Sequence, residues 1–98
     1  MTVTPKKVTL LAGGVGGAKM AEGLAALEDV DLSVIGNIAD DQMFHGLWVS
    51  PDIDTLTYSL AGLIDRAQGW GVTADGDRAL SMLARLGKET WMKLGDYD

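Results

Sequence analysis

The glycine run from Gly13 to Gly17 constrains the fold of this chain most, because of what stands on either side of it. Before it, the short and mostly apolar segment Val8 to Ala12 predicts a buried strand. After it, helical spacing of apolar residues predicts a helix from Gly17 to about Glu28, and Leu32 to Ile35 predicts a second buried strand. A strand, a glycine turn, a helix and a strand in this order form a βαβ unit with two parallel strands and a right-handed crossover.

The rest of the chain predicts further elements of the same fold class. We expect a loop at 38–46, an extended piece at 47–49, a helix from 51 to about 66, a turn at 68–71, a helix at 77–86 and a strand at 90–94. Ser50 suits the N-cap of the second helix and Pro51 its first position. Three parallel strands with three helices indicate an α/β fold with a thin, Rossmann-like doubly wound parallel sheet. We interpret residues 1–98 as the N-terminal part of a longer enzyme domain.

Composition and charge argue against several classes of function. The net charge of −6 argues against a nucleic-acid binder, which would carry a basic face. The chain has no cysteine, so it forms neither a disulfide nor a thiolate metal site. It lacks the apolar stretch of about 18 residues that a membrane span needs, and its N-terminus does not resemble a signal peptide. We expect a cytoplasmic protein that binds no membrane; an uncovered sheet edge or apolar face would favour a homo-oligomer.

The glycines predict an anion site at the start of the first helix. Gly13, Gly14, Gly16 and Gly17 are more than a turn requires, and they let backbone N–H groups approach a phosphate at a helix N-terminus. The run is not a P-loop, because no Gly-Lys-Ser/Thr closes it, and in the dinucleotide fingerprint Lys19 takes the third glycine position. We expect Lys19 to add a charge-assisted contact to the phosphate. The alternative is a tight turn beside a solvated lysine.

Acidic residues follow the glycines without any neutralising cation. Residues 20–65 contain nine carboxylates and no lysine or arginine. Asp40 and Asp41 follow the second strand, at the sheet edge where open α/β folds bind ligands, and Asp52 and Asp54 begin the second helix. Carboxylates this close repel one another unless a metal, a hydrogen-bond donor or water compensates them. The two pairs predict a site that handles phosphate through a divalent cation; the alternatives are a solvated acidic loop and ordinary helix N-terminal charges.

Two further side chains are candidates for contact with a ligand. Trp70 stands between two glycines in a turn, which makes it the best placed of the three tryptophans for stacking on a ring. Lys93 stands beside the final acidic turn, at the end of the third expected strand, and either faces a ligand or is an ordinary surface lysine. His45, the only histidine, is more simply an incidental loop residue than a catalytic one.

Seven short motifs occur in order along nearly the whole chain. They are Gly13–Lys19, Asn37–Asp41, Gly46-Leu47, Ser50–Thr55, Tyr58–Gly62, Gly69-Trp70-Gly71 and Leu94-Gly95-Asp96. Together they resemble the 2-phospho-L-lactate transferase family of deazaflavin coenzyme F-420 biosynthesis. The Ser-Pro-Asp-Ile-Asp-Thr and Gly-Trp-Gly segments are the specific parts of this resemblance. Family members commonly continue Gly-Asp-Arg-Asp and are much longer, whereas Tyr97 replaces that arginine here, so the resemblance is to the N-terminal third of such an enzyme.

The resemblance implies a phosphoryl-ester transfer. The ribityl hydroxyl of a deazaflavin riboside attacks the phosphorus of a guanosine diphosphate-linked lactate or enolpyruvate and releases GMP. This chemistry needs positioning, a cation that spreads charge over the transferring oxygens, and a group that orients the hydroxyl. The sequence leaves open which acid the donor carries and which metal is used, for which Mg²⁺ is the expectation.

The resemblance also assigns a role to each candidate residue. The four glycines hold phosphate of the donor, the metal takes Asp40, Asp41 and Asp52, catalysis takes Asp52 and Asp54, and Lys93 is a second acceptor contact. Lys19, Asn37 and Trp70 are further candidates for binding a ligand. Asp54 is expected to contact the acceptor hydroxyl or to act as the base. The alternatives are a nucleotide-sugar-binding regulator of related fold without turnover, a nicotinamide-dependent oxidoreductase fragment, and an inactive fragment.

Overall fold

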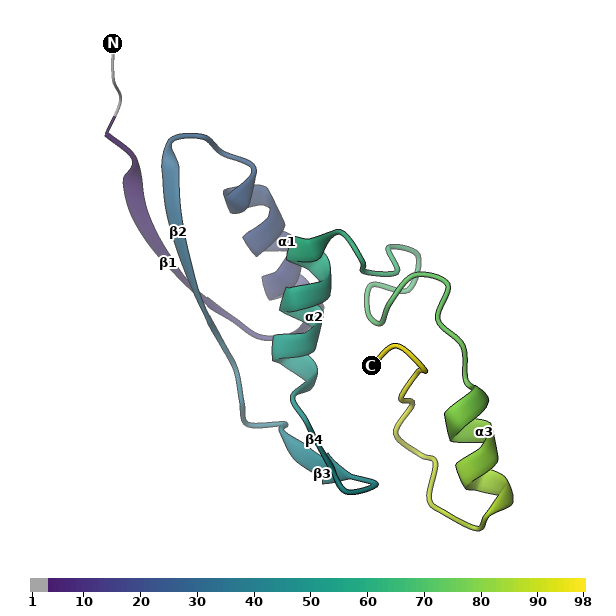
Figure 1. The fold of residues 1–98 in the computed structure, drawn as a ribbon. Coiled ribbons are helices and arrows are strands. Elements are labelled where there is room, and N and C mark those ends of the chain that lie inside the picture. The colour runs from purple at the N-terminus through teal and green to yellow at the C-terminus, as the bar shows by residue number, and fades with distance from the viewer. Residues whose placement is uncertain (1–3) are drawn as a thin grey trace.

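The computed structural model describes residues 4–98 and shows an α/β arrangement. In chain order the elements are β1 (Lys6–Ala12), α1 (Gly14–Ala25), β2 (Val30–Gly36), β3 (Gln42–Phe44), β4 (Leu47–Val49), α2 (Pro51–Ala61) and α3 (Arg78–Arg85) (Figure 1). Strands β1 and β2 pair in parallel along their whole length, from Lys6 opposite Val30 to Ala12 opposite Gly36. The parallel β1–α1–β2 unit predicted from the glycine run is therefore confirmed.

The small core lies between the β1–β2 sheet and the helices α1 and α2, which pack against each other beside it (Figure 1). Its buried residues are Ala12, Ala18, Ala21 and Leu56, with Leu10 and Val34 packed against them. On the other face of the sheet Leu11 and Ile35 lie opposite each other and are 76% and 58% exposed. The helices therefore cover one face of this sheet, and the other face presents apolar side chains to solvent.

The described chain is elongated and exposes more surface than a closed domain. Its radius of gyration is 16.3 Å, against about 13 Å for a compact chain of this length. Its accessible surface is 6971 Å², against about 5,400 Å² for a compact protein of this mass. These values agree with the interpretation of the chain as part of a domain.

The glycine run begins α1 earlier than predicted. The helix begins at Gly14 and ends at Ala25, three residues before each predicted bound. Gly14 has a φ of +63°, a conformation that glycine adopts without strain, so the chain turns directly from β1 into the helix. Gly17 allows the helix to lie against the strand, because a Cβ there would stand 2.8 Å from the Cβ of Ala12.

The strand predicted at Thr90 to Leu94 is wrong, and so is the loop predicted from Ile38 to Gly46. No strand forms at 90–94, so the parallel sheet has two strands rather than three. In the predicted loop, β3 pairs antiparallel with β4 in a separate hairpin. His45 and Gly46 connect the two strands with φ values of 51° and 80°, and two positive φ angles suit a two-residue hairpin turn.

The two remaining helices lie close to their predicted positions. Helix α2 begins at Pro51 as expected but ends at Ala61 instead of about Arg66, because Gly62 adopts a left-handed conformation with φ of 74°. Helix α3 follows Asp77 and is followed by Gly87, whose φ of 80° ends it as predicted. Met82 of α3 and Leu86, its C-cap, are exposed, and the structure places this helix away from the β1–β2 sheet (Figure 1).

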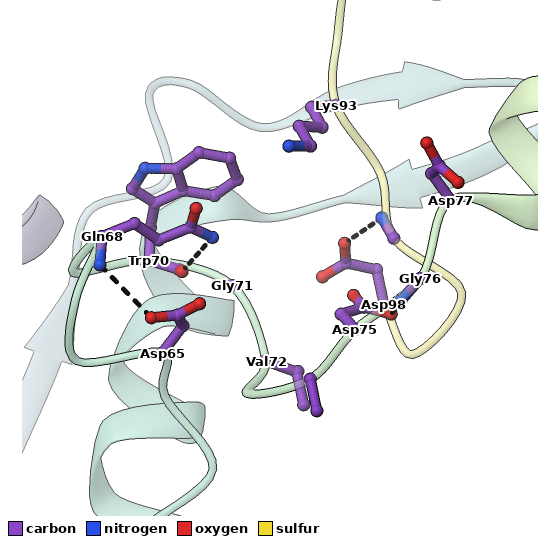
Figure 2. A pocket seen from close by; sticks show the side chains of 12 residues that line it. Asp65, Gln68, Trp70, Gly71, Val72, Asp75, Gly76, Asp77, Lys93 and Asp98 are labelled. Atoms are coloured by element: carbon purple, nitrogen blue, oxygen red, sulfur yellow. Dashed lines mark hydrogen bonds between the residues drawn. The ribbon is translucent and has the colours of Figure 1, made fainter.

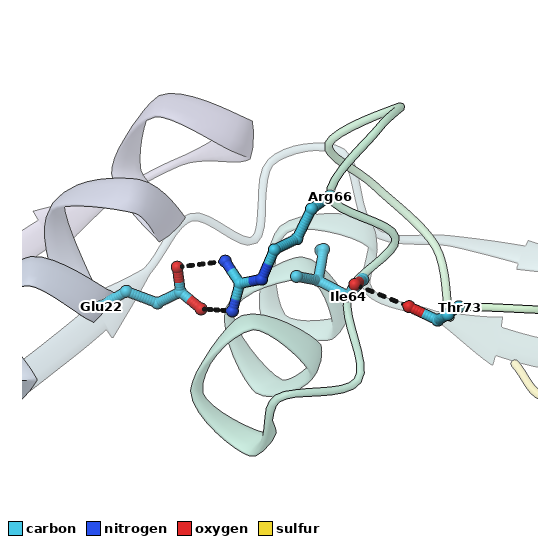
Figure 3. Close-up of polar contacts among 4 residues, drawn as sticks. All are labelled: Glu22, Ile64, Arg66 and Thr73. Atoms are coloured by element: carbon cyan, nitrogen blue, oxygen red, sulfur yellow. Dashed lines mark hydrogen bonds and ion pairs between the residues drawn. The ribbon is translucent and has the colours of Figure 1, made fainter.

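An ion pair ties the loop after α2 to α1. The guanidinium of Arg66 donates hydrogen bonds from Nη2 to Glu22 Oε1 (2.8 Å) and from Nη1 to Glu22 Oε2 (3.0 Å), as Figure 3 shows. In the same loop the hydroxyl of Thr73 donates to the carbonyl of Ile64 at 2.8 Å. These contacts fix the start of the segment that leads into the turn at Gln68 to Gly71. The structure confirms this predicted turn.

We expect Glu22→Gln to destabilise the chain slightly at neutral pH and to have no effect in acid. The hydrogen bond and charge of Arg66 lower the pKa of the Glu22 carboxyl from its ordinary value of 4.5. A lowered folded-state pKa gives stability that is present above the unfolded pKa and is lost as the pH falls through the folded pKa. Denaturant unfolding of both proteins at neutral and acid pH measures the difference. Glu28→Gln is the matched control, and a difference that persisted in acid would contradict this origin.

Candidate active site

Three segments meet at the carboxyl ends of β1 and β2. The N–H of Asn37 donates to the carbonyl of Ala12 at 2.8 Å, which holds the two strand ends together. The side-chain amide of Asn37 donates to Asp52 Oδ2 at 2.9 Å, and a Cβ on Gly13 would lie 3.5 Å from the same oxygen. The structure thus brings Gly13, Asn37 and Asp52 together at the start of α1, and their roles in ligand binding stay a prediction.

The start of α1 has the properties of an anion site. Gly13 occupies the N-cap position and offers no side-chain cap, and the first turn of the helix contains no acidic residue. The first N–H groups of a helix have no partner inside the helix and carry its positive dipole end. The nearby carboxylate of Asp52 belongs to α2, so a phosphate at these amides would share the site with that acid unless a cation lies between them.

The four glycines have different surroundings. Gly13 and Gly14 lie toward Asp52, Gly17 packs on β1, and a Cβ on Gly16 would meet nothing within 4 Å. Lys19 is exposed and lines a hollow of about 60 Å³ with Glu22 and Arg66, away from the Asn37–Asp52 contact. The contact of Lys19 with phosphate stays a prediction.

The Asp40-Asp41 pair is divided between solvent and the protein. Asp40 is exposed, whereas Asp41 is half-buried and its Oδ2 accepts a hydrogen bond from the Ser50 hydroxyl at 2.8 Å. The predicted role of Ser50 is therefore wrong in part: it stands at the N-cap of α2, but its side chain bonds Asp41 instead of capping the helix. The other oxygen, Asp41 Oδ1, is buried without a hydrogen-bond partner among residues 4–98.

Asp52 and Asp54 face opposite sides of the first turn of α2. Two residues advance a helix by about 200°, so side chains at this spacing do not face each other. Asp52 lies toward Gly13 and Asn37, whereas Asp54 lies toward the C-terminal segment of the chain. Partial burial raises the pKa of Asp54, and the charges of Asp98 and Asp41 raise it further.

Asp54 shares a cavity with Trp70 and Lys93, the two further candidates for contact with a ligand. A cavity of about 220 Å³ is lined by Asp54, Tyr58, Trp70, Lys93 and Asp98, among others, and we call it the acceptor cavity. Lys93 Nζ lies 5.6 Å from the centre of the Trp70 ring, within cation–π distance. Figure 2 shows Trp70 and Lys93 on the wall of an adjoining hollow of about 400 Å³, which Asp98 also lines. The structure therefore brings Asp54, Trp70 and Lys93 together.

Two residues of this cavity are absent from the sequence-based site. Tyr58 lies one turn after Asp54 on the same face of α2, and its hydroxyl donates to Asp98 Oδ1 at 2.9 Å. The i, i+4 spacing of Asp54 and Tyr58 is a signal that the sequence contains. Asp98 has no comparable signal, because its contact depends on how the C-terminal segment returns to α2.

The described residues only partly build a cation site. Within residues 4–98 no group of three or more histidine, aspartate or glutamate side chains is arranged to hold a metal ion. Mg²⁺ in phosphoryl-transfer sites is often held by one or two carboxylates, with waters and substrate phosphates as its remaining ligands. The buried and unpartnered oxygen of Asp41 fits such a cation, so Mg²⁺ stays a prediction that depends on oxygens from the substrate.

No helix in the described part of the chain is both long and apolar enough to cross a membrane.

Comparisons with known proteins identify the family of the chain. The family model described as 2-phospho-L-lactate transferase CofD matches residues 8–93. The 2-phospho-L-lactate transferase of Methanopyrus kandleri is 42% identical over 92 residues, which are 94% of this chain and 29% of the relative. The phosphoenolpyruvate transferase of Streptomyces griseus is 45% identical over 94 residues (94% and 30%), and that of Nocardia farcinica is 41% identical over 97 residues (97% and 29%). The chain thus spans less than a third of the length of these relatives, and it belongs to the 2-phospho-L-lactate transferase CofD family.

Proposed function

We propose that this chain carries part of the donor site and part of the acceptor site of a transferase. The transferase moves a 2-phospholactyl or enolpyruvyl-phosphate group from a guanosine diphosphate-linked donor to the ribityl hydroxyl of a deazaflavin riboside. One observation carries the proposal: the first turn of α2 presents Asp52 to the glycine end of α1 and Asp54 to the acceptor cavity. Two substrates bound on these two sides would meet at the start of α2.

On the donor side, backbone amides at the start of α1 bind the phosphates of the donor. Gly13 and Gly14 allow the phosphate to approach the backbone, because neither position carries a side chain. Asn37 holds Asp52 in place through its amide. At most two of the predicted ligands, Asp41 and Asp52, would hold Mg²⁺ together with phosphate oxygens and waters, because no three carboxylates of residues 4–98 converge; when bound, the cation would spread the charge of the transferring oxygens.

On the acceptor side, Asp54 orients the ribityl hydroxyl and accepts its proton. The hydroxyl oxygen forms a bond to the phosphorus that carries the lactyl or enolpyruvyl group, and the bond from that phosphorus to the oxygen of the GMP leaving group breaks. The raised pKa of Asp54 makes its carboxylate a better base than an exposed aspartate. Trp70 offers a flat face for the deazaflavin ring, and Lys93 offers a positive charge beside it.

Titration of the chain with deazaflavin riboside, followed by ligand fluorescence in the presence of Mg²⁺, tests the acceptor side. We expect saturable binding, and we expect Lys93→Ala to weaken it about 10- to 150-fold, since a hydrogen bond from a charged group contributes about 1.5–3 kcal/mol. Lys6→Ala, an exposed lysine of β1, is the matched control and should bind as the unchanged chain does.

Absence of acceptor binding would favour a regulator that binds nucleotides without turnover. Saturable binding of NADH in place of deazaflavin riboside would favour an oxidoreductase fragment instead. A transfer assay that follows GMP release then separates an active transferase from a chain that binds its substrates without reaction.

A further inference from the structure

The C-terminal segment from Leu94 to Asp98 is joined to α2 through one carboxylate. Asp98 Oδ1 accepts a hydrogen bond from the Tyr58 hydroxyl at 2.9 Å, and Asp98 Oδ2 accepts one from the backbone N–H of Gly95 at 2.7 Å. Asp98 therefore closes its own turn with one oxygen and binds helix α2 with the other. The Tyr58 hydroxyl is the only side-chain group of α2 that donates a hydrogen bond to this segment in the described chain.

The same segment is anchored to the start of α3 by two other acids. The carboxylate of Asp96 accepts hydrogen bonds from the N–H groups of Arg78 (3.2 Å) and Ala79 (2.9 Å), and so caps α3. Asp75 accepts one from the N–H of Tyr97 at 3.0 Å. The segment is thus fixed to α3 at one end and to α2 only through Tyr58.

Lys93 directly precedes this segment and has no regular structure of its own. The predicted strand at 90–94 does not form, so no ladder of backbone hydrogen bonds sets the position of Lys93. Its Nζ nevertheless lies near the Trp70 ring and lines the acceptor cavity with Asp54. Trp91, which packs edge-to-face on Phe44, fixes the chain on one side of Lys93, and the anchored segment fixes it on the other.

We propose that Tyr58 is a positioning residue of the acceptor cavity: its hydrogen bond to Asp98 holds the C-terminal segment against α2 and so places Lys93 opposite Asp54. What the cavity binds rests on the function proposed above, whereas the positioning itself is a property of the chain alone. Burial and the neighbouring carboxylates, Asp98 first, raise the pKa of Tyr58, so its hydroxyl remains a donor at neutral pH.

Nuclear magnetic resonance of the chain without ligand tests the positioning directly. Protons beside an aromatic face are shifted by its ring current, so the ε-methylene signals of Lys93 report the distance of Lys93 from Trp70. In Tyr58→Phe we expect these signals to move to the values of an unstructured lysine, and hydrogen exchange at the N–H of Asp96 and Tyr97 to become at least tenfold faster. Tyr97→Phe is the matched control, because it removes a hydroxyl that makes no hydrogen bond within residues 4–98 and belongs to an exposed side chain.

Two substitutions of Asp98 supply the rescue experiment. Asp98→Asn keeps one oxygen that accepts from Tyr58 but loses the acceptor of the Gly95 N–H, whereas Asp98→Ala loses both acceptors, so the Lys93 signals should shift less in the first variant. Asp98 is exposed, so both variants are expected to fold. If faster hydrogen exchange of the α1 amides shows that Tyr58→Phe is unfolded, the two Asp98 variants test the proposal in its place. Lys93 signals that remain unchanged in Asp98→Ala or in folded Tyr58→Phe would overturn the proposal.

Binding of deazaflavin riboside connects the positioning to function. We expect Tyr58→Phe to raise the dissociation constant about as much as Lys93→Ala does, and Tyr97→Phe to leave it unchanged. A chain that does not bind deazaflavin riboside at all but shows the predicted Lys93 shifts would overturn the proposed function and support the positioning. Unaltered affinity in Tyr58→Phe, with the Lys93 signals displaced, would show that Lys93 is not an acceptor contact.

Discussion

Replacing Asp54 with asparagine is expected to lower the rate of transfer to deazaflavin riboside by about 100- to 10,000-fold, the usual contribution of a positioned acid or base. Asparagine keeps the shape of aspartate but cannot accept the proton of the attacking hydroxyl. Asp54 is half-buried in the first turn of α2 and lines the acceptor cavity with Lys93, so the substitution removes one charge and little packing. GMP release, measured in a protein that contains this chain and is competent for transfer, gives the rate.

Asp31→Asn is the matched control for this prediction. Asp31 is exposed on β2, and its substitution makes the same chemical change away from the cavity. Near-normal turnover in Asp54→Asn would remove Asp54 from the reaction. A weaker acceptor affinity with an unchanged maximal rate would assign Asp54 to binding the hydroxyl and leave the proton to another group.

Gly17→Ala is expected to destabilise the chain by about 1–3 kcal/mol, the usual cost of placing extra atoms in a packed contact. The added Cβ would lie 2.8 Å from the Cβ and 3.0 Å from the Cα of Ala12, so the strand backbone itself must move. Ala12 belongs to the small core, which has few other buried side chains to compensate. The free energy of unfolding, measured with denaturant, tests this prediction.

Gly16→Ala is the matched control, one residue earlier in the same helix. A Cβ there meets nothing within 4 Å, and alanine favours a helix interior by about 0.5–1 kcal/mol over glycine. We therefore expect opposite signs for neighbouring substitutions of the same kind. Equal effects at the two positions would show that helix propensity, rather than contact with β1, decides the stability of α1.

The first half of the fold was predictable because its signals are local. The periodicity of β1, α1 and β2 and the glycines between them all lie within a single βαβ unit. The strand predicted at Thr90 to Leu94 failed for the opposite reason, since a strand needs a partner and the described chain offers none there. Trp91 instead packs edge-to-face on Phe44, with ring centres 5.2 Å apart, a contact across many residues that no local pattern reveals.

In the candidate site, too, some contacts follow from local sequence signals and others depend on tertiary structure. The approach of Gly13 and Asn37 follows from parallel topology, because the carboxyl ends of neighbouring strands lie at one edge, whereas the contact with Asp52 depends on how α2 packs. The opposite directions of Asp52 and Asp54 follow from helix geometry, although the sequence alone suggested a single acidic pair. The bond of Ser50 to Asp41 depends on tertiary structure, and the sequence gives no means of choosing it over a helix cap.

Because Asp52 and Asp54 are carried by one helical turn with a single residue between them, the spacing of the two carboxylates is set by peptide geometry. A tilt of α2 displaces both carboxylates at once, in opposite directions relative to the groups that they would contact. Motion of a loop alone therefore cannot adjust the position of either carboxylate. Substitutions on the Trp70 wall, by contrast, leave this spacing untouched. Redesign toward other tricyclic alcohols would therefore begin at that wall and keep the helix turn as its fixed reference.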